Sequence, residues 1–233
     1  MGNPKFSPEN GVTFEETALK EKTVWRLEKA LTLKTQIIEN GGKAEIFEAD
    51  LSNGESAKSI MNFAETNFGT VNILINNTAH CELPDTILKT DESMIDRHFS
   101  INTKAVILLI CEFSKRFIAS GQKVGRIINI NTDSAQMFAN QISYGASKTA
   151  IEAYTRSLAI ELGQCGITVN MIAPVPIQTG WIDENLEKHL LPTIPGRRLG
   201  YPKDIADCLL FLVSEQASFI TGQVIKVSGG HAI

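Results

Sequence analysis

The chain has 233 residues, of which 43% are hydrophobic and 21% are charged. This length suits one α/β domain or two small ones, and the composition excludes disordered and fibrous proteins. The formal net charge of −4 argues against proteins that bind nucleic acids or acidic membranes, because such proteins usually need a basic face.

The expected elements alternate between helices and strands along the chain. Residues 1–12 are rich in Pro, Asn, Gly and Ser, which predicts a loose segment. Thr13 and Glu16 form a capping box, and the apolar spacing after it predicts a helix that Gly41 and Gly42 end. Further helices are expected over residues 56–68, 91–119, 147–162 and 202–213, and strands over residues 44–49, 71–75, 126–130, 168–173 and 223–227.

Strands that alternate with helices of this length pair in parallel, with right-handed crossovers. The sequence thus predicts an α/β fold in a single domain over residues 13–233. In such sheets ligands bind beyond the carboxyl ends of the strands, so the residues just after each strand are candidates for a site. These residues are Asp50, Asn76 to Ala79, Asn131 to Ser134 and Pro174 to Thr179.

Four cysteines are scattered without the paired spacing of a zinc site or a disulfide framework. Free thiols in a reducing cytoplasm are therefore expected. The four histidines form no metal-ligand pattern, which favours surface positions or hydrogen-bonded positions in the core. The N-terminus has no signal-peptide core, and the longest strongly apolar run, residues 105–111, is too short to cross a bilayer. The sequence predicts a cytoplasmic protein without nucleic-acid, membrane or metal partners.

Tyr144 and Lys148, in the segment SYGASK, lie four residues apart at the start of an expected helix. That spacing places both side chains on one helix face, one turn apart. A free tyrosine has a pKa of about 10, and a lysine ammonium one turn away lowers that pKa by favouring the phenolate. The pair is therefore a candidate proton donor and acceptor for the interconversion of an alcohol and a carbonyl. Taken alone, the spacing also fits an exposed helical turn.

An ordered set of motifs surrounds this pair. Upstream lie NNTA after a buried strand, Asn102 inside a helix, and RIINI followed by Thr132 and Ser134. Downstream lie TVNMIAPVPIQTG and GRRLGYPKDIADCLLFLVSEQASFITGQVIKVSGG. The set resembles the short-chain dehydrogenase/reductase (SDR) family, in particular its branch like the 3-oxoacyl-carrier-protein reductases, over residues 44–230. The resemblance implies a Rossmann-like doubly wound parallel sheet and an oxidoreductase that uses NAD or NADP to interconvert a carbonyl and a secondary alcohol.

The resemblance also implies a role for each matching position. Tyr144 exchanges the proton with the substrate oxygen, and Lys148 lowers the pKa of that tyrosine and holds the ribose hydroxyls of the nicotinamide. Thr132 stands where the family usually has a serine that hydrogen-bonds the substrate carbonyl, with Ser134 as the alternative. Asn102 binds a water that links Lys148 to solvent. The positions implied in cofactor binding are Asp50 at the adenine with Leu51 beside it, Asn76, Asn77 and Thr78 along the cofactor, Lys148, and Pro174, Ile177 and Thr179 at the carboxamide.

The start of the chain departs from the family pattern. The family begins with a strand, a glycine-rich TGxxxGxG turn at the pyrophosphate, a helix and a second strand, whereas residues 13–40 read as one helix. The sequence therefore predicts a sheet that lacks the first βαβ unit, with unpaired edges at residues 44–49 and 71–75. Three explanations stay open: a start assigned downstream of the true one, a decayed enzyme, or a layer rebuilt by residues 1–40. The alternative function is a truncated, catalytically silent SDR homologue that acts only by oligomerising.

The resemblance further implies a small-molecule substrate and a homodimer or homotetramer. Family members usually pair through the long helices expected here over residues 91–119 and 147–162. The choice between NAD and NADP stays open, because the second strand that sets it in the family is not found. The substrate also stays open, because the loop at residues 181–191 is typical of a lid but names no ligand.

Overall fold

The computed structural model describes residues 16–132, 139–180 and 182–231. Within these residues the chain forms a parallel sheet in the order β1-β2-β3-β4. The strands are β1 (Ile73–Asn76), β2 (Gly125–Ile130), β3 (Ile167–Pro174) and β4 (Val224–Val227). The apolar, β-branched runs at β2 and β3 become the two inner strands, which are covered on both faces. The predicted α/β fold with parallel pairing is confirmed.

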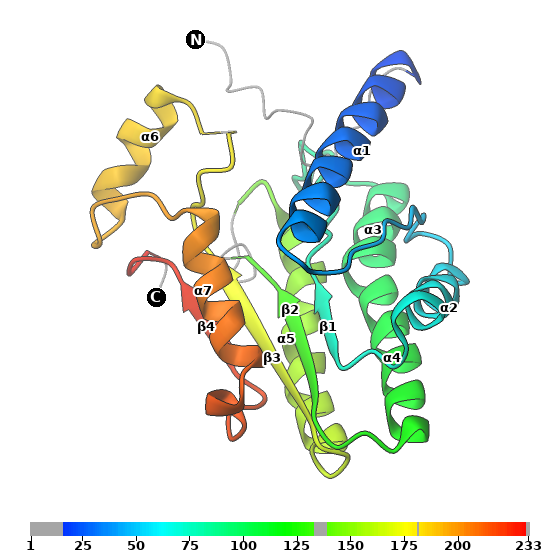
Figure 1. The fold of residues 1–233 in the computed structure, drawn as a ribbon. Helices are drawn as coiled ribbons and strands as arrows, with labels where there is room; N and C mark the ends of the chain where they lie inside the picture. Colours follow the sequence, from blue (N-terminus) through cyan, green and yellow to red (C-terminus); the bar gives the residue numbers. More distant parts are fainter. Residues whose placement is uncertain (1–15, 133–138, 181, 232–233) are drawn as a thin grey trace.

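Helices connect the strands (Figure 1). They are α1 (Glu16–Glu39), α2 (Ser56–Phe68), α3 (Glu92–Phe99), the π-helical η2 (Ser100–Ala105), α4 (Val106–Ser120), α5 (Ile142–Gly163), α6 (Glu184–Leu190), η4 (Leu191–Thr193), α7 (Pro202–Val213) and η5 (Glu215–Ala217). The helices predicted over residues 56–68 and 202–213 are confirmed. The predicted stretch 91–119 divides into α3, η2 and α4, while α5 begins five residues before the expected start at residue 147.

Helices cover both faces of the sheet. Ile127 and Ile128 are neighbours in β2, so their side chains point to opposite faces. Ile127 packs in a core cluster with Phe113 and Phe117 of α4, and Ile128 packs with Leu212 of α7. Figure 1 shows α4 and α5 on one side of the sheet and α7 on the other. The sheet is therefore doubly wound, as predicted.

The strand predicted over residues 44–49 is wrong. This segment has no strand structure, although it lies between α1 and α2 as expected. The ring of Phe47 instead stacks on Phe63 of α2 with ring centroids 4.7 Å apart, and Glu45 accepts a hydrogen bond from Lys34 at 2.7 Å. A strand needs a hydrogen-bonded neighbour, and the described residues offer this segment none. The Phe47 side chain therefore packs against a helix instead of pairing as part of a strand.

The edge of the sheet at β1 is open within the described part of the chain. There β1 pairs with β2 on one side only, and its Ile73 and Ile75 side chains are each 43% exposed. The predicted loose segment 1–12 lies outside the described residues. The domain division at residue 13 and the absence of the first βαβ unit therefore stay predictions. None of the described helices combines the length and the apolar composition that crossing a membrane requires.

Candidate active site

Tyr144 and Lys148 occupy the first two turns of α5, beside the carboxyl end of β2. Lys148 is buried, with 4% of its surface exposed, and its Nζ donates to the carbonyl oxygen of Ile130 at 3.0 Å. Ile130 is the last residue of β2. This bond holds the ammonium group at the edge of the sheet where ligands bind in folds of this kind.

The environment of Lys148 changes the acidity of two groups. Burial lowers the pKa of Lys148 from 10.5 to about 8, an effect that the Cys81 thiol opposes. Burial likewise raises the pKa of Cys81 to about 11, and the charge of Asp85 adds to this increase while Lys148 opposes it. A lysine with a pKa near 8 still carries its charge at neutral pH, but it gives up its proton far more readily than a lysine in water.

Asn102 joins the loop after β1 to α5. The residue is fully buried in η2, and π-helical turns occur frequently at functional sites. Its Oδ1 accepts from the His80 N–H at 2.7 Å, and its Nδ2 donates to the His80 carbonyl at 2.8 Å and to Ser147 Oγ at 2.9 Å. The Ser147 hydroxyl in turn donates to the carbonyl of Tyr144 at 2.8 Å. Ser147 thus connects Asn102 to Tyr144, two of the predicted catalytic positions.

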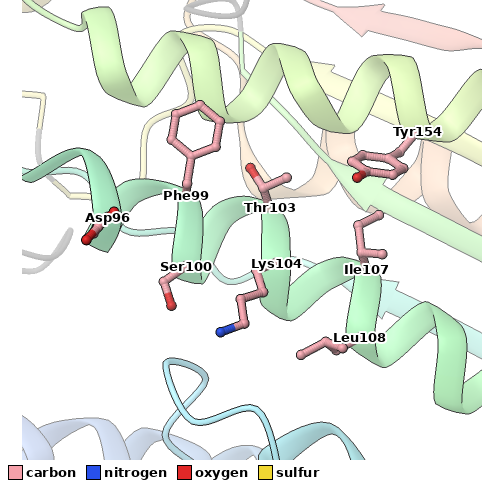
Figure 2. A pocket seen from close by; sticks show the side chains of 8 residues that line it. All are labelled: Asp96, Phe99, Ser100, Thr103, Lys104, Ile107, Leu108 and Tyr154. Carbon is pink, nitrogen blue, oxygen red and sulfur yellow. The ribbon is translucent and has the colours of Figure 1, made fainter. Parts of the chain in front are cut away.

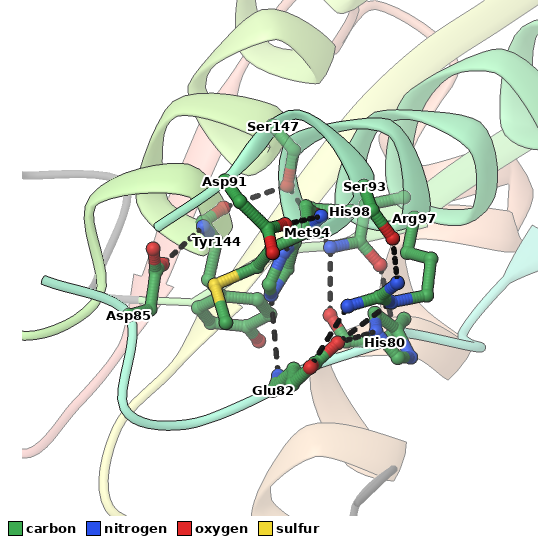
Figure 3. Close-up of polar contacts among 11 residues, drawn as sticks. His80, Glu82, Asp85, Asp91, Ser93, Met94, Arg97, His98, Tyr144 and Ser147 are labelled. Carbon is green, nitrogen blue, oxygen red and sulfur yellow. Dashed lines mark hydrogen bonds and ion pairs between the residues drawn. The ribbon is translucent and has the colours of Figure 1, made fainter. Parts of the chain in front are cut away.

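The ring of Tyr144 lies beside a buried histidine that the sequence did not single out (Figure 3). The His98 ring packs edge-on at a centroid distance of 6.3 Å and is fully buried. Its Nε2 accepts from the Glu82 N–H at 3.2 Å, and its Nδ1 lies 2.9 Å from the Met94 carbonyl. Because a main-chain N–H can only donate, Nε2 is the acceptor and Nδ1 carries the proton. These bonds assign His98 as a hydrogen-bonded core residue, one of the two roles expected for the histidines.

An ion pair between Glu82 and Arg97 holds the loop that follows β1. Both carboxylate oxygens of Glu82 accept from Arg97, at 2.8 and 2.9 Å, and this pairing lowers the pKa of Glu82. The His80 ring packs on His98 at a centroid distance of 5.0 Å, and its pKa is lowered, chiefly by burial. The loop at residues 79–82 is therefore fixed against α3 by one ion pair and by the edge-on contact of two imidazole rings.

The candidate carbonyl-binding hydroxyls follow β2. Thr132 is half-buried, two residues after the carbonyl that receives Lys148. Ser134 lies outside the described residues.

The NNTA motif divides into a buried and an exposed part. Asn76 is buried at the end of β1 and donates to Asn129 Oδ1 at 2.9 Å, and Asn129 donates to Thr155 of α5 at 3.1 Å. This chain of buried amides ties β1, β2 and α5 together. Asn77 and Thr78 follow at the surface, beyond the end of the strand.

The remaining predicted cofactor positions lie at two separate places. Pro174 ends β3, Ile177 forms an isolated bridge with Gly200, and Thr179 is exposed. Asp50 lies on the exposed loop before α2, next to the half-buried Leu51, and accepts from the Ser52 N–H and hydroxyl, which lowers its pKa. The structure thus brings Tyr144, Lys148, Asn102 and Thr132 to one region, while the Asp50 carboxylate accepts from Ser52, two residues further along the chain.

Comparisons with known proteins agree over most of the chain. A family model described as enoyl-(acyl carrier protein) reductase matches residues 23–232. The chain is 37% identical over 196 residues to the uncharacterized oxidoreductase YjdA of Bacillus subtilis, covering 84% of this chain and 78% of that protein. It is also 37% identical over 188 residues to the 3-oxoacyl-[acyl-carrier-protein] reductase FabG of Buchnera aphidicola, covering 78% and 74%. The chain belongs to the SDR family.

Solved SDR structures extend this result to the cofactor. The fold is similar to that of a 7α-hydroxysteroid dehydrogenase complexed with NADH and 7-oxo glycochenodeoxycholic acid, with a TM-score of 0.81, 31% identity, and coverage of 88% and 80%. A 3-ketoacyl-(acyl-carrier-protein) reductase of Brucella melitensis complexed with NADH gives a TM-score of 0.74 at 31% identity, covering 79% and 77%. This SDR is an NAD(P)-dependent oxidoreductase of carbonyl and alcohol groups.

The residues at the carboxyl edge fit one half of such a cofactor. An ammonium group has three donors, and Lys148 directs one to the Ile130 carbonyl, so ribose hydroxyls are suitable acceptors for the others. The pyrophosphate half differs. Between residue 16 and β1, the described chain of this SDR contains no strand that leads into a glycine-rich turn and a helix. The described residues therefore fit the nicotinamide end and lack the family's phosphate cradle.

Proposed function

We propose that this SDR interconverts a carbonyl and a secondary alcohol with Tyr144 as the proton donor and acceptor at the substrate oxygen. The observation that carries the proposal is the position of Lys148, buried one turn after Tyr144 and hydrogen-bonded to the end of β2. A bound NAD or NADP supplies the hydride. The positive charge of Lys148 favours the phenolate of Tyr144 and so makes the phenol a stronger acid.

Other residues complete the proposed site. Lys148 also holds the ribose hydroxyls next to the nicotinamide, and Asn102 binds a water that passes protons between Lys148 and solvent. Thr132, or Ser134 in its place, hydrogen-bonds the substrate carbonyl. The remaining proposed cofactor contacts are Asp50, Leu51, Asn76, Asn77, Thr78, Pro174, Ile177 and Thr179.

The substrate class is a small molecule that carries a ketone or a secondary alcohol. A relative named as a 3-oxoacyl-carrier-protein reductase makes a 3-oxoacyl thioester the first substrate to test. The four free cysteines support a reducing cytoplasm as the place of action.

A titration of the full chain with NADH and with NADPH tests the proposal. Saturable change in the cofactor's fluorescence is expected, with the curve shifted to higher concentration in Lys148→Ala. The same shift is not expected in Lys115→Ala, because Lys115 is exposed on α4. No response at millimolar cofactor would instead favour the silent homologue, a second candidate supported by the absence of a phosphate cradle among the residues that the structure describes.

A second copy of this chain is the partner that we propose. A pocket of about 580 Å³ opens on the outer side of α3, η2 and α4, where Tyr154 of α5 also contributes (Figure 2). Its lining mixes apolar side chains such as Ile107 and Leu108 with Asp96 and Lys104. These are the helices through which SDR proteins usually pair. Light scattering distinguishes the proposed homodimer or homotetramer from a monomer.

A further inference from the structure

The N-terminus of α5 is capped from a distant loop. The first N–H groups of a helix have no acceptor inside the helix, and Gln141 at the N-cap position makes no side-chain cap bond. Asp85 provides the acceptors instead, 58 residues from Ser143 in the sequence. Its Oδ2 accepts from the N–H groups of Ser143 at 2.7 Å and Tyr144 at 2.9 Å, and its main-chain oxygen accepts from Ile142 at 3.3 Å.

The carboxylate of Asp85 is itself held in place. The residue is fully buried, and its Oδ1 lies 3.0 Å from Thr90 Oγ1, whose single proton is shared between this oxygen and the Thr86 carbonyl at 2.8 Å. Burying a carboxylate is unfavourable unless its oxygens are hydrogen-bonded, and here both oxygens have partners. The positive end of the helix dipole of α5 also faces this negative charge. Such a group has one well-defined position, so it can define the position of the helix turn that it binds.

We infer that Asp85 is a positioning residue that fixes the first turn of α5 and thereby the place of the Tyr144 hydroxyl. The inference rests on the proposed function of Tyr144. The N–H of Tyr144 is one of the two donors to the carboxylate, whereas Lys148 has its own bond to the Ile130 carbonyl. Loss of Asp85 therefore displaces Tyr144 more than Lys148. Turnover and cofactor binding should respond differently.

Asp85→Ala is the variant that tests this. It removes the carboxylate that accepts from the Ser143 and Tyr144 N–H groups and leaves the main-chain acceptor of Ile142 in place. Because a displacement of 1 Å can cost about a hundredfold in rate, kcat is expected to fall by about that factor. The cofactor dissociation constant is expected to stay within about twofold, since Lys148 keeps its bond. Asp85→Asn should restore most of kcat, because its amide oxygen can accept from the same two N–H groups while its NH₂ donates to Thr90.

Asp91→Ala is the matched control. Asp91 caps α3, where its Oδ1 accepts from the Met94 N–H at 2.8 Å, and α3 carries neither Tyr144 nor Lys148. Asp91→Ala also removes a carboxylate that caps a helix. Because this helix does not carry Tyr144 or Lys148, kcat of Asp91→Ala should stay near the wild-type value. If Asp85→Ala does not fold, Thr90→Val is the second variant to measure. It keeps the Asp85 carboxylate and removes the Thr90 hydroxyl that helps to orient this carboxylate. Its kcat should lie between those of wild type and Asp85→Ala.

Amide hydrogen exchange measures how firmly Asp85 holds the first turn of α5, and it needs no substrate. In Asp85→Ala, or Thr90→Val to a smaller extent, the amides of Ser143 and Tyr144 should exchange faster than in wild type, while the turn around Lys148 stays protected. Unchanged exchange at these amides, or an equal loss of kcat in Asp85→Ala and Asp91→Ala, would overturn the inference. Failure of the proposed function is a separate result, since it is seen in the wild type as absent turnover and does not affect the exchange rates.

Discussion

Tyr144→Phe is expected to abolish turnover while cofactor affinity stays nearly unchanged. The substitution removes only the hydroxyl that exchanges the proton, and positioned acid–base groups contribute about 10²- to 10⁴-fold to rates. The ring and its packing against His98 are kept. Cofactor oxidation followed by absorbance gives kcat, and the fluorescence titration gives the dissociation constant.

Tyr154→Phe is the matched control for this experiment. Tyr154 lies on the same helix but faces the outer pocket, and it is 44% exposed. Loss of its hydroxyl should leave kcat unchanged. The assignment of the proton-transfer role to Tyr144 fails if Tyr144→Phe turns over at a rate similar to Tyr154→Phe.

Lys148→Met is expected to weaken both turnover and cofactor binding, and to change how stability depends on pH. The folded-state pKa of Lys148, about 8, lies below the value of 10.5 in water, so the folded chain loses this proton first as the pH rises. Between these two pKa values the unfolded chain binds more protons, and stability therefore increases with pH across this window. Below pH 8 the charged side chain costs the folded state about 3 kcal/mol. Methionine has no charge to bury and removes this pH dependence.

Denaturant unfolding of wild type and Lys148→Met at pH 7 and at pH 10 measures how the free energy of unfolding of each depends on pH. The free energy of unfolding of wild type should rise relative to that of Lys148→Met as the pH rises from 8 toward 10.5. Lys115→Met provides the control, because Lys115 has a largely exposed side chain on α4. Parallel pH profiles for wild type and Lys148→Met would show that the lysine is not buried as a charged group.

The spacing of apolar residues along the sequence predicted those helices and strands whose buried faces can be recognised from the segment alone. The apolar runs of β2 and β3 indicate strands covered on both faces wherever they pair, and the spacing in residues 56–68 indicates a helix face without reference to its partner. Residues 44–49 have a strand-like composition, but a strand exists only with a hydrogen-bonded neighbour. That neighbour is not encoded in the segment itself, so the prediction failed. The helix α6 was missed because its seven residues are too few for a periodic pattern.

The sequence likewise predicted only those parts of the candidate site that leave a local signal. The four-residue spacing of Tyr144 and Lys148 is a local signal for a shared helix face, and the order of the surrounding motifs indicated the family. Asp85 and His98 were not found, because their hydrogen-bonding and ring partners include residues far away in the sequence. A single aspartate after a proline carries no signal of a helix that begins more than 50 residues later. Only the fold brings such groups together.

A crystal structure of the full chain with NADH or NADPH bound tests the central claim most directly. The account predicts the nicotinamide at the carboxyl edge of β2, with Lys148 Nζ and the Tyr144 hydroxyl both within about 3 Å of the ribose hydroxyls or of each other. A cofactor bound elsewhere on the chain, or a Tyr144 hydroxyl directed away from both Lys148 and the nicotinamide, would contradict it.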